Sequence, residues 1–361
     1  MARKLKSDRI LFQTTLALVC LSVLMVYSAA AADNPYNYLI KQVMWAVLGF
    51  TLLSVVMRID YRSYREPAFI WTAVGSVTLA LVAVLFMPEH NNASRWFGFG
   101  GLGIQPSEPA KLAAIVFIAA LLERRMHRVN ELNYALLPIA VVVLVWIGLI
   151  LWEPDLGTSV AIALITFVMV FAAGLNYGYI AGVVLAAIPA VAFLVMSAGY
   201  RKRRFLAFLN PWQDPLGDGY QIIQSLIAVA TGGFTGRGLM DGVQKLRYLP
   251  EAQTDFIYAV IAEELGMIGA TLILVCFCVI AWRGLRISLE APDKFGAFLA
   301  LGLTTMVVVQ AFVNMSVVLG LFPTKGIPLP FVSFGGSSLL VNLVGMGVLL
   351  NISQHATPSE A

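Results

Sequence analysis

The sequence contains few charged residues for its length. Lysine, arginine, aspartate and glutamate make up 12% of the 361 residues, whereas about a quarter of an average soluble protein is charged. The net charge is only +4, and we expect no nucleic-acid partner. Apolar residues make up 59% of the chain. Because so few charges cannot cover that much apolar surface in water, we expect lipid to surround most of the protein.

Cysteine and histidine are also scarce, with three of each. Cys276 and Cys278 are two positions apart, so on a helix they point away from each other. His90, His127 and His355 are scattered along the chain. We therefore expect no disulfide framework and no His/Cys metal cluster, and we assign no metal ligands.

Long apolar runs recur from one end of the chain to the other. A membrane-spanning helix needs roughly 20 apolar residues. Ten runs approach or meet this length: 10–31, 39–57, 68–87, 107–122, 135–152, 156–174, 178–198, 256–281, 295–320 and 329–350. The sequence predicts an all-α, polytopic membrane protein with a single domain over 1–361. A large loop at 199–255 separates the seventh and eighth helices, and a short tail covers 352–361.

The basic residues predict the orientation. The first run is about 20 residues long, longer than the apolar core of a signal peptide, so we expect it to be retained. If all ten runs cross the membrane, one side receives most of the basic residues of the short loops. Basic loops face the cytoplasm, so both termini are expected there and 199–255 outside. That loop is itself basic, which indicates that it binds an anionic partner. The alternative is a surface loop whose charges are simply solvated.

Glu108 and Lys111 lie in the first turn of the fourth run, three positions apart on one helical face. Ser107 is a candidate helix cap. One interpretation is a pair that neutralises its own charge. The other is that Glu108 holds Lys111 toward a phosphate-bearing ligand.

Glu153 and Asp155 flank Pro154 between the fifth and sixth runs. Asp155 is a candidate N-cap of the sixth helix, and we favour this structural role over a catalytic one.

Asp255 lies where the polar loop meets the eighth run. Thr254 is a candidate N-cap there, and Glu251 lies one turn earlier. Burial raises the pKa of a carboxyl group and nearby cations lower it, so Asp255 is a candidate general base. A helix-N-terminal aspartate that stabilises the dipole is an equal alternative.

Glu263 and Glu264 lie inside the eighth run, where carboxylates need partners from other segments. Lys111 and Arg237 are the candidates on the same side of the membrane. Prolines and glycines between 323 and 338 interrupt the helix that leads into the tenth run. Such a break is tolerated where backbone lines a cavity, although close packing of small residues also explains it.

Six segments in order resemble the SEDS family (shape, elongation, division and sporulation) of peptidoglycan polymerases. These segments are 105–111, 154–158, 210–215, 219–225, 244–266 and 323–338. The resemblance implies ten transmembrane helices in the bacterial cytoplasmic (inner) membrane, with the active site on the outer face. It also implies polymerisation of lipid II, the undecaprenyl-diphosphate-linked disaccharide peptide, into a glycan strand. The sequences around 243–250 and 323–326 resemble the FtsW division branch more than the RodA elongation branch. Gln253 departs from the histidine most often found in the family.

The resemblance implies that Asp255 is the catalytic residue, and we expect it to act as a general base. The leaving diphosphate needs cations, and arginine suits phosphate. The candidate substrate-binding residues are Lys111, Glu108, Arg95, Arg201, Arg204, Arg237, Lys245, Ser337 and Ser338. The candidate supporting residues are Glu251, Thr254, Glu263, Glu264, Asp155 and Lys325. A divalent ion, Mg²⁺ or Mn²⁺, is a further candidate.

The expected partners are a class B penicillin-binding protein, which is a transpeptidase, and other proteins of a division or elongation complex. Two rival functions are a transporter that flips lipid II and a scaffold without catalysis. A flippase needs no base at Asp255, and a scaffold tolerates the loss of both Asp255 and Lys111.

Overall fold

The structure, a computed structural model, describes residues 7–88, 95–99, 102–197, 199–324 and 326–356. Ten helices lie over the ten predicted runs: α1 (Arg9–Ala29), α2 (Pro35–Val56), α3 (Pro67–Val84), α4 (Ser107–Arg125), α5 (Leu137–Trp152), α6 (Leu156–Ala172), α7 (Tyr177–Met196), α10 (Ile257–Glu290), α11 (Lys294–Val318) and α12 (Gly336–Ser353). The all-α class is confirmed. Two helices, α8 (Gly199–Leu209) and α9 (Tyr220–Gly232), lie in the large loop. The short elements are η1 (Tyr61–Arg65), η2 (Met126–Arg128), η3 (Leu132–Leu136), η4 (Pro211–Gln213), β1 (Phe97–Phe99) and β2 (Leu102–Ile104), the last two forming an antiparallel hairpin.

Seven helices in the described part of the chain are long and apolar enough to cross a membrane. They are α1, α2, α3, α10, α11, α12 and the stretch Leu132–Trp152 that contains α5. Helix α6 is apolar but has only 17 residues. The chain is therefore a multi-pass membrane protein, and the number of ten crossings stays a prediction. Helix α12 begins seven residues later than the predicted 329 and continues two residues into the predicted tail, whose last part, 357–361, lies outside the described residues.

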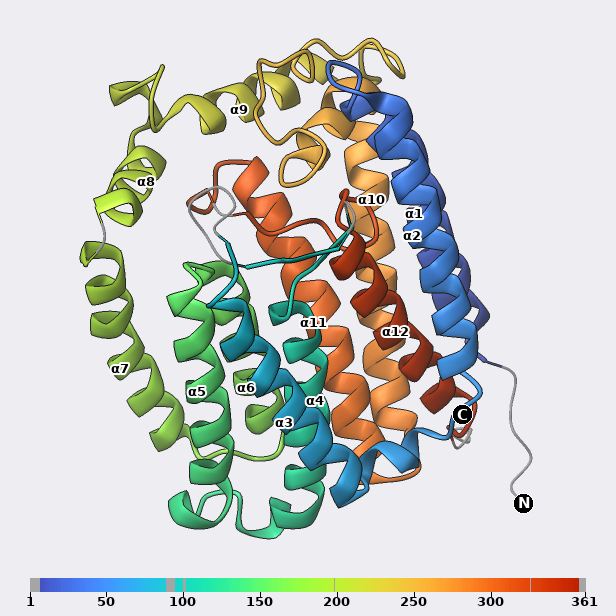
Figure 1. The fold of residues 1–361 in the computed structure, drawn as a ribbon, viewed down its shortest axis with the longest axis vertical. Coiled ribbons are helices and arrows are strands. Elements are labelled where there is room, and N and C mark those ends of the chain that lie inside the picture. Colours follow the sequence, from blue (N-terminus) through green and yellow to red (C-terminus); the bar gives the residue numbers. More distant parts are fainter. Residues whose placement is uncertain (1–6, 89–94, 100–101, 198, 325, 357–361) are drawn as a thin grey trace.

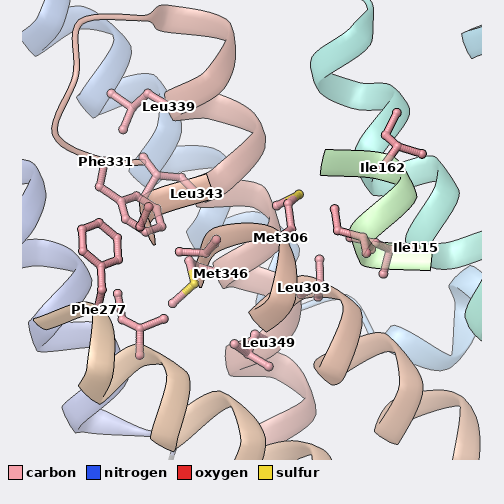
Figure 2. Close-up of a cluster of buried hydrophobic side chains, with 14 of the residues drawn as sticks. Ile115, Ile162, Phe277, Leu303, Met306, Phe331, Leu339, Leu343, Met346 and Leu349 are labelled. Carbon is pink, nitrogen blue, oxygen red and sulfur yellow. The ribbon is translucent and has the colours of Figure 1, made fainter. Parts of the chain in front are cut away.

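The helices form one bundle around α11 and α12 (Figure 1). Helices α1 and α2 lie at one edge and α7 at the other, while α8 and α9 lie across one end. The core is built from apolar side chains such as Ile115 of α4, Phe277 of α10, Leu303 of α11 and Met346 of α12 (Figure 2). Apolar faces all round are typical of helices buried inside a large bundle.

The start of α1 and the end of α12 lie beside each other at the end of the bundle opposite the large loop (Figure 1). The backbone N–H of Asp8 donates to Oγ of Ser353, and the Asp8 carboxylate caps α1 and pairs with Arg283 of α10. The first and last spans therefore start and finish on the same side, as an even number of crossings requires.

Helix α10 is broken at Gly266, where φ is +67°, a left-handed conformation that favours glycine. The break leaves backbone groups without helical partners, and the large loop supplies them. Carbonyls of residues 263–264 accept from the amides of 237–238, and amides of 267–268 donate to the carbonyls of 233–234. The loop is thereby fixed to the broken helix, because unpaired backbone groups are costly away from water.

Candidate active site

Asp255 lies in a turn immediately before α10. Its backbone N–H donates to the carbonyl of Glu251 at 3.1 Å. The predicted cap at Thr254 is wrong, because α10 begins at Ile257 without a side-chain cap. The Thr254 hydroxyl instead donates to the Glu251 carboxylate at 2.9 Å, so these two predicted supporting residues stabilise the turn itself.

A segment distant in sequence holds this turn from the other side. The backbone N–H of Phe334 donates to the carbonyl of Gln253, and the Ser333 hydroxyl donates to the carbonyl of Thr254. Gly326 lies against the Asp255 carboxylate, since a Cβ at this glycine would be 2.8 Å from Oδ2. The interrupted helix before α12 therefore lets backbone approach Asp255 closely. Lys325, the neighbouring candidate, lies outside the described residues.

The environment of Asp255 raises its pKa to about 7. Burial is the main cause, and the negative charges of Glu251 and Asp155 act in the same direction. The positive charges of Arg204 and Arg95 oppose them. A carboxylate whose pKa lies near neutrality suits a general base, because it accepts a proton readily and about half of it is ionised at neutral pH.

The turn between α5 and α6 brings further charge to this site. Asp155 caps α6 by accepting from the backbone N–H of Thr158 at 3.1 Å, which confirms the predicted cap, and its carboxylate also accepts from the Gln105 amide at 3.0 Å. Arg95 donates to the carbonyls of Glu153 and Pro154 at 2.6 and 2.7 Å. The structure therefore places Arg95 and Asp155 beside each other and close enough to act on Asp255.

The Glu153 carboxyl group has no hydrogen-bond partner on either oxygen, although its side chain is buried. Burial raises its pKa to about 8, and the neighbouring charge of Asp155 adds to the rise. The group is therefore neutral at pH 7, because an unpaired buried charge is expensive.

Glu108 and Lys111 form the predicted pair, with Nζ 2.9 Å from Oε1. The Lys111 ammonium also donates to the Gln310 amide of α11 at 3.0 Å, and its side chain is 2% exposed. The pair itself is common to both interpretations, and the burial of Lys111 favours a pair that neutralises its own charge. The predicted Ser107 cap is wrong, since α4 begins at this residue and its hydroxyl is buried without a partner.

Ser337 and Ser338 also make internal contacts. The Ser337 hydroxyl donates to the carbonyl of Gly103 at 2.8 Å and accepts from the backbone N–H of Gln105. The Ser338 hydroxyl accepts from the Asn342 amide at 3.2 Å. Ser337 therefore joins the β1–β2 hairpin to the start of α12.

The carboxylates of Glu263 and Glu264 face the large loop rather than Lys111. Arg237 pairs with Glu263 at 3.3 Å, as predicted. Glu264 pairs with Lys245 at 2.7 Å, a partner that was predicted for phosphate instead. The Lys245 ammonium also donates to the Ser28 hydroxyl of α1 at 2.8 Å, and the side chain is 4% exposed. The structure does not bring Lys245 to the surface near Asp255, so we leave it out of the proposed phosphate contacts.

The remaining arginines lie on α8. Arg204 is exposed and acts on the charge of Asp255. Arg201 is three positions earlier on the same helix.

Among the described residues no group of three or more His, Cys, Asp or Glu could hold a metal ion. Mg²⁺ is usually bound by only one or two carboxylates and the phosphates of a substrate, so the neighbouring carboxylates of Asp255 and Glu251 have the chemistry to share such an ion.

Two residues of α11 were missed from the sequence. Gln310 contacts Lys111, and Asn314 contacts the Asp255 backbone. Both are amides one turn apart in an apolar span. The cost of polar groups in lipid would have marked them as functional or paired.

Comparisons with known proteins show the family of this chain. The sequence model of the FtsW, RodA and SpoVE family, described as cell cycle protein, matches residues 8–358. A Geobacter metallireducens protein named probable peptidoglycan glycosyltransferase FtsW is 43% identical over 96% of this chain and 94% of its own length. Stage V sporulation protein E of Bacillus subtilis is 41% identical over 98% and 99% of the two chains.

Two solved structures have the same fold. A chain from a study of polymerization and crosslinking by a peptidoglycan synthase complex matches with a TM-score of 0.81 and 31% identity, over 97% of this chain and 98% of that chain. Rod shape determining protein RodA of Thermus thermophilus matches with a TM-score of 0.74 and 27% identity, over 98% and 99%. With a family match over nearly its whole length and relatives above 40% identity, the chain belongs to the FtsW, RodA and SpoVE family, the SEDS family that its six motifs resemble.

Proposed function

We propose that this protein is a peptidoglycan glycosyltransferase that polymerises lipid II, with a role in cell division more than in elongation. The names of its relatives support the activity and the division branch. The observation that carries the proposal is the placement of Asp255. Its carboxyl group lies between the turn before α10 and the segment at Gly326, with Arg95 and Arg204 nearby.

In the proposed reaction, Asp255 accepts the proton from the 4-hydroxyl of the acceptor sugar. The oxygen then forms a bond to C1 of the donor sugar, and the bond from C1 to the diphosphate breaks. A single displacement inverts C1, so an α-linked diphosphate gives a β-linked glycan. Arg95 and Arg204 stabilise the charge that grows on the diphosphate, since cations near a leaving group lower the barrier.

A divalent ion fits this site as a proposed cofactor. Glu251 is exposed beside Asp255 and would hold Mg²⁺ or Mn²⁺ together with the substrate diphosphate. The ion would supply positive charge to the leaving group.

The proposed orientation places α8, α9 and Asp255 on the outer face and both termini in the cytoplasm, as the basic loops indicate. The proposed partner is a class B penicillin-binding protein that cross-links the new strand. The structural likeness to a chain from a peptidoglycan synthase complex supports such a partnership.

A lipid II polymerisation assay on the purified protein, with and without its transpeptidase, tests the function. Wild type should lengthen glycan and Asp255→Asn should not. Asp241→Asn is the matched control, because it removes an exposed carboxylate from the same loop. A wild-type protein that moves lipid II across vesicles without lengthening glycan would show a flippase instead. Equal polymerisation by Asp255→Asn would remove the proposed base.

A further inference from the structure

Two amide side chains on one face of α11 lie beside the candidate active site. Gln310 and Asn314 are four positions apart, and each is 2% exposed. The Gln310 amide donates to the carbonyl of Pro328 at 3.0 Å and accepts from Lys111. Asn314 lies one turn nearer to Asp255. The proposed reaction assigns neither residue a role.

Asn314 joins two segments that are distant in the sequence. Its Nδ2 donates to the carbonyl of Asp255 at 2.8 Å and to the carbonyl of Ile327 at 2.7 Å. An amide nitrogen has two N–H groups, so both donors are used. The Oδ1 atom is left buried without a partner. Because both neighbours are carbonyls, only the amide nitrogen can face them, and the orientation of the side chain is fixed.

These two contacts span the place where Asp255 must act. Ile327 follows Gly326, whose backbone lies against the Asp255 carboxylate. The turn that carries Asp255 belongs to the large loop, whereas residues 326–328 belong to the interrupted approach to α12. A catalytic group has to be held within about 0.5 Å of its productive position, and such precision depends on locked supporting contacts. Asn314, on a buried helix, supplies a contact of this kind to both segments.

We propose that Asn314 is a positioning residue for glycosyl transfer: its amide fixes the Asp255 turn and the 326–328 segment at a set distance. The inference rests on the proposed function, with Asp255 as the base. Asn314 touches backbone rather than substrate, so it acts through Asp255. Gln310, one turn away on α11, likewise links two segments, because it bonds to Lys111 of α4 and to the carbonyl of Pro328.

The variant Asn314→Leu tests the proposal, because leucine is of similar size and has no donors. We expect kcat for lipid II polymerisation to fall by about 100-fold, the loss that a misplacement of roughly 1 Å causes, with KM for lipid II within about twofold. The pH midpoint of kcat should also move to lower pH. Burial is the main cause of the raised pKa of Asp255, and a released turn admits more water.

Asn351→Leu is the matched control. Asn351 is also a fully buried asparagine whose amide bonds to backbone, since it donates to the carbonyl of Met57 and accepts from the backbone N–H of Tyr61, which ties the turn between α2 and η1 to α12. It lies near the opposite end of α12. This variant should lower thermal stability while kcat per folded molecule and its pH midpoint stay as in wild type.

Loss of stability in Asn314→Leu with an unchanged kcat and an unchanged pH midpoint would overturn the proposal. If Asn314→Leu fails to fold, Asn314→Thr replaces it, because threonine keeps one O–H donor. Its kcat should fall by about tenfold, with the same direction of change in the pH midpoint. Wild-type kcat and pH midpoint in the threonine variant would equally overturn it. Failure of the proposed function is distinguishable, because then either wild type would not polymerise lipid II at all or Asp255→Asn would polymerise it as wild type does.

Discussion

Replacing Asp255 with asparagine should abolish polymerisation and at the same time make the protein more stable above pH 7. The pKa of Asp255 is about 7 in the folded protein, against an ordinary value of 3.8. The folded state therefore favours the protonated carboxyl group, whereas the unfolded chain ionises freely above pH 4. Ionisation of Asp255 then lowers the free energy of unfolding, and this loss grows as the pH rises from about 4 to 7.

The size of the effect follows from the two pKa values. A tenfold change in proton affinity corresponds to about 1.4 kcal/mol, so the difference between 3.8 and about 7 gives at most about 4 kcal/mol above pH 7. Water near this partly exposed side chain reduces the measured value below that limit. Asparagine has the same shape and no charge to bury, so Asp255→Asn escapes this cost.

Thermal unfolding in detergent, followed from pH 5 to pH 8.5, measures this difference. The midpoint of Asp255→Asn should exceed that of wild type by a margin that widens up to pH 7 and is constant above pH 8. The exposed control Asp241→Asn should show no such widening. A margin that is independent of pH, or a variant less stable than wild type at pH 8, would refute the argument that burial raises the pKa of Asp255.

Three further predictions concern other parts of the site. Glu153→Gln should be as active as wild type at pH 7. Above pH 8 the wild-type Glu153 carboxyl group ionises beside Asp155, so wild type should lose activity there while the variant keeps it. Identical alkaline limits of the two proteins in a pH–rate profile would contradict this prediction. Lys245→Met should lower the free energy of unfolding by about 3–5 kcal/mol, because it leaves Glu264 buried without its cation, and Glu264→Gln in the same chain should restore most of that loss in a thermal scan. EDTA should stop polymerisation, and Mg²⁺ or Mn²⁺ should restore it; full activity in EDTA would remove the divalent ion from the proposal.

The sequence was sufficient for two contacts between residues that are close in the chain. The Glu108–Lys111 pair and the Asp155 cap both depend on residues three positions apart, and both were predicted. It failed at helix ends, where one residue decides the geometry. Ser107 and Thr254 have the chemistry of caps, yet α4 begins at Ser107 and α10 begins beyond Thr254.

The sequence does not predict which carboxylate each lysine or arginine pairs with. Lys111, Arg237 and Lys245 were all candidate cations for phosphate, and nothing in the sequence separates them. The fold pairs each with a carboxylate and buries two of them. A salt bridge between residues 19 positions apart, such as Lys245–Glu264, depends on how the loop folds back on α10.

The lack of charge and the repeated apolar runs determined by themselves that the chain is a helical membrane protein. In lipid the backbone must satisfy its own hydrogen bonds, and long apolar runs do so as helices. The sequence also singled out Asp255. Only the tertiary structure decided what surrounds it: Gly326 against its carboxylate, Asn314 on its backbone and Arg95 within range of its charge. The reason is physical. Hydrophobicity is a property of consecutive residues along the chain, whereas the burial that raises the pKa of Asp255 arises when segments distant in sequence pack together.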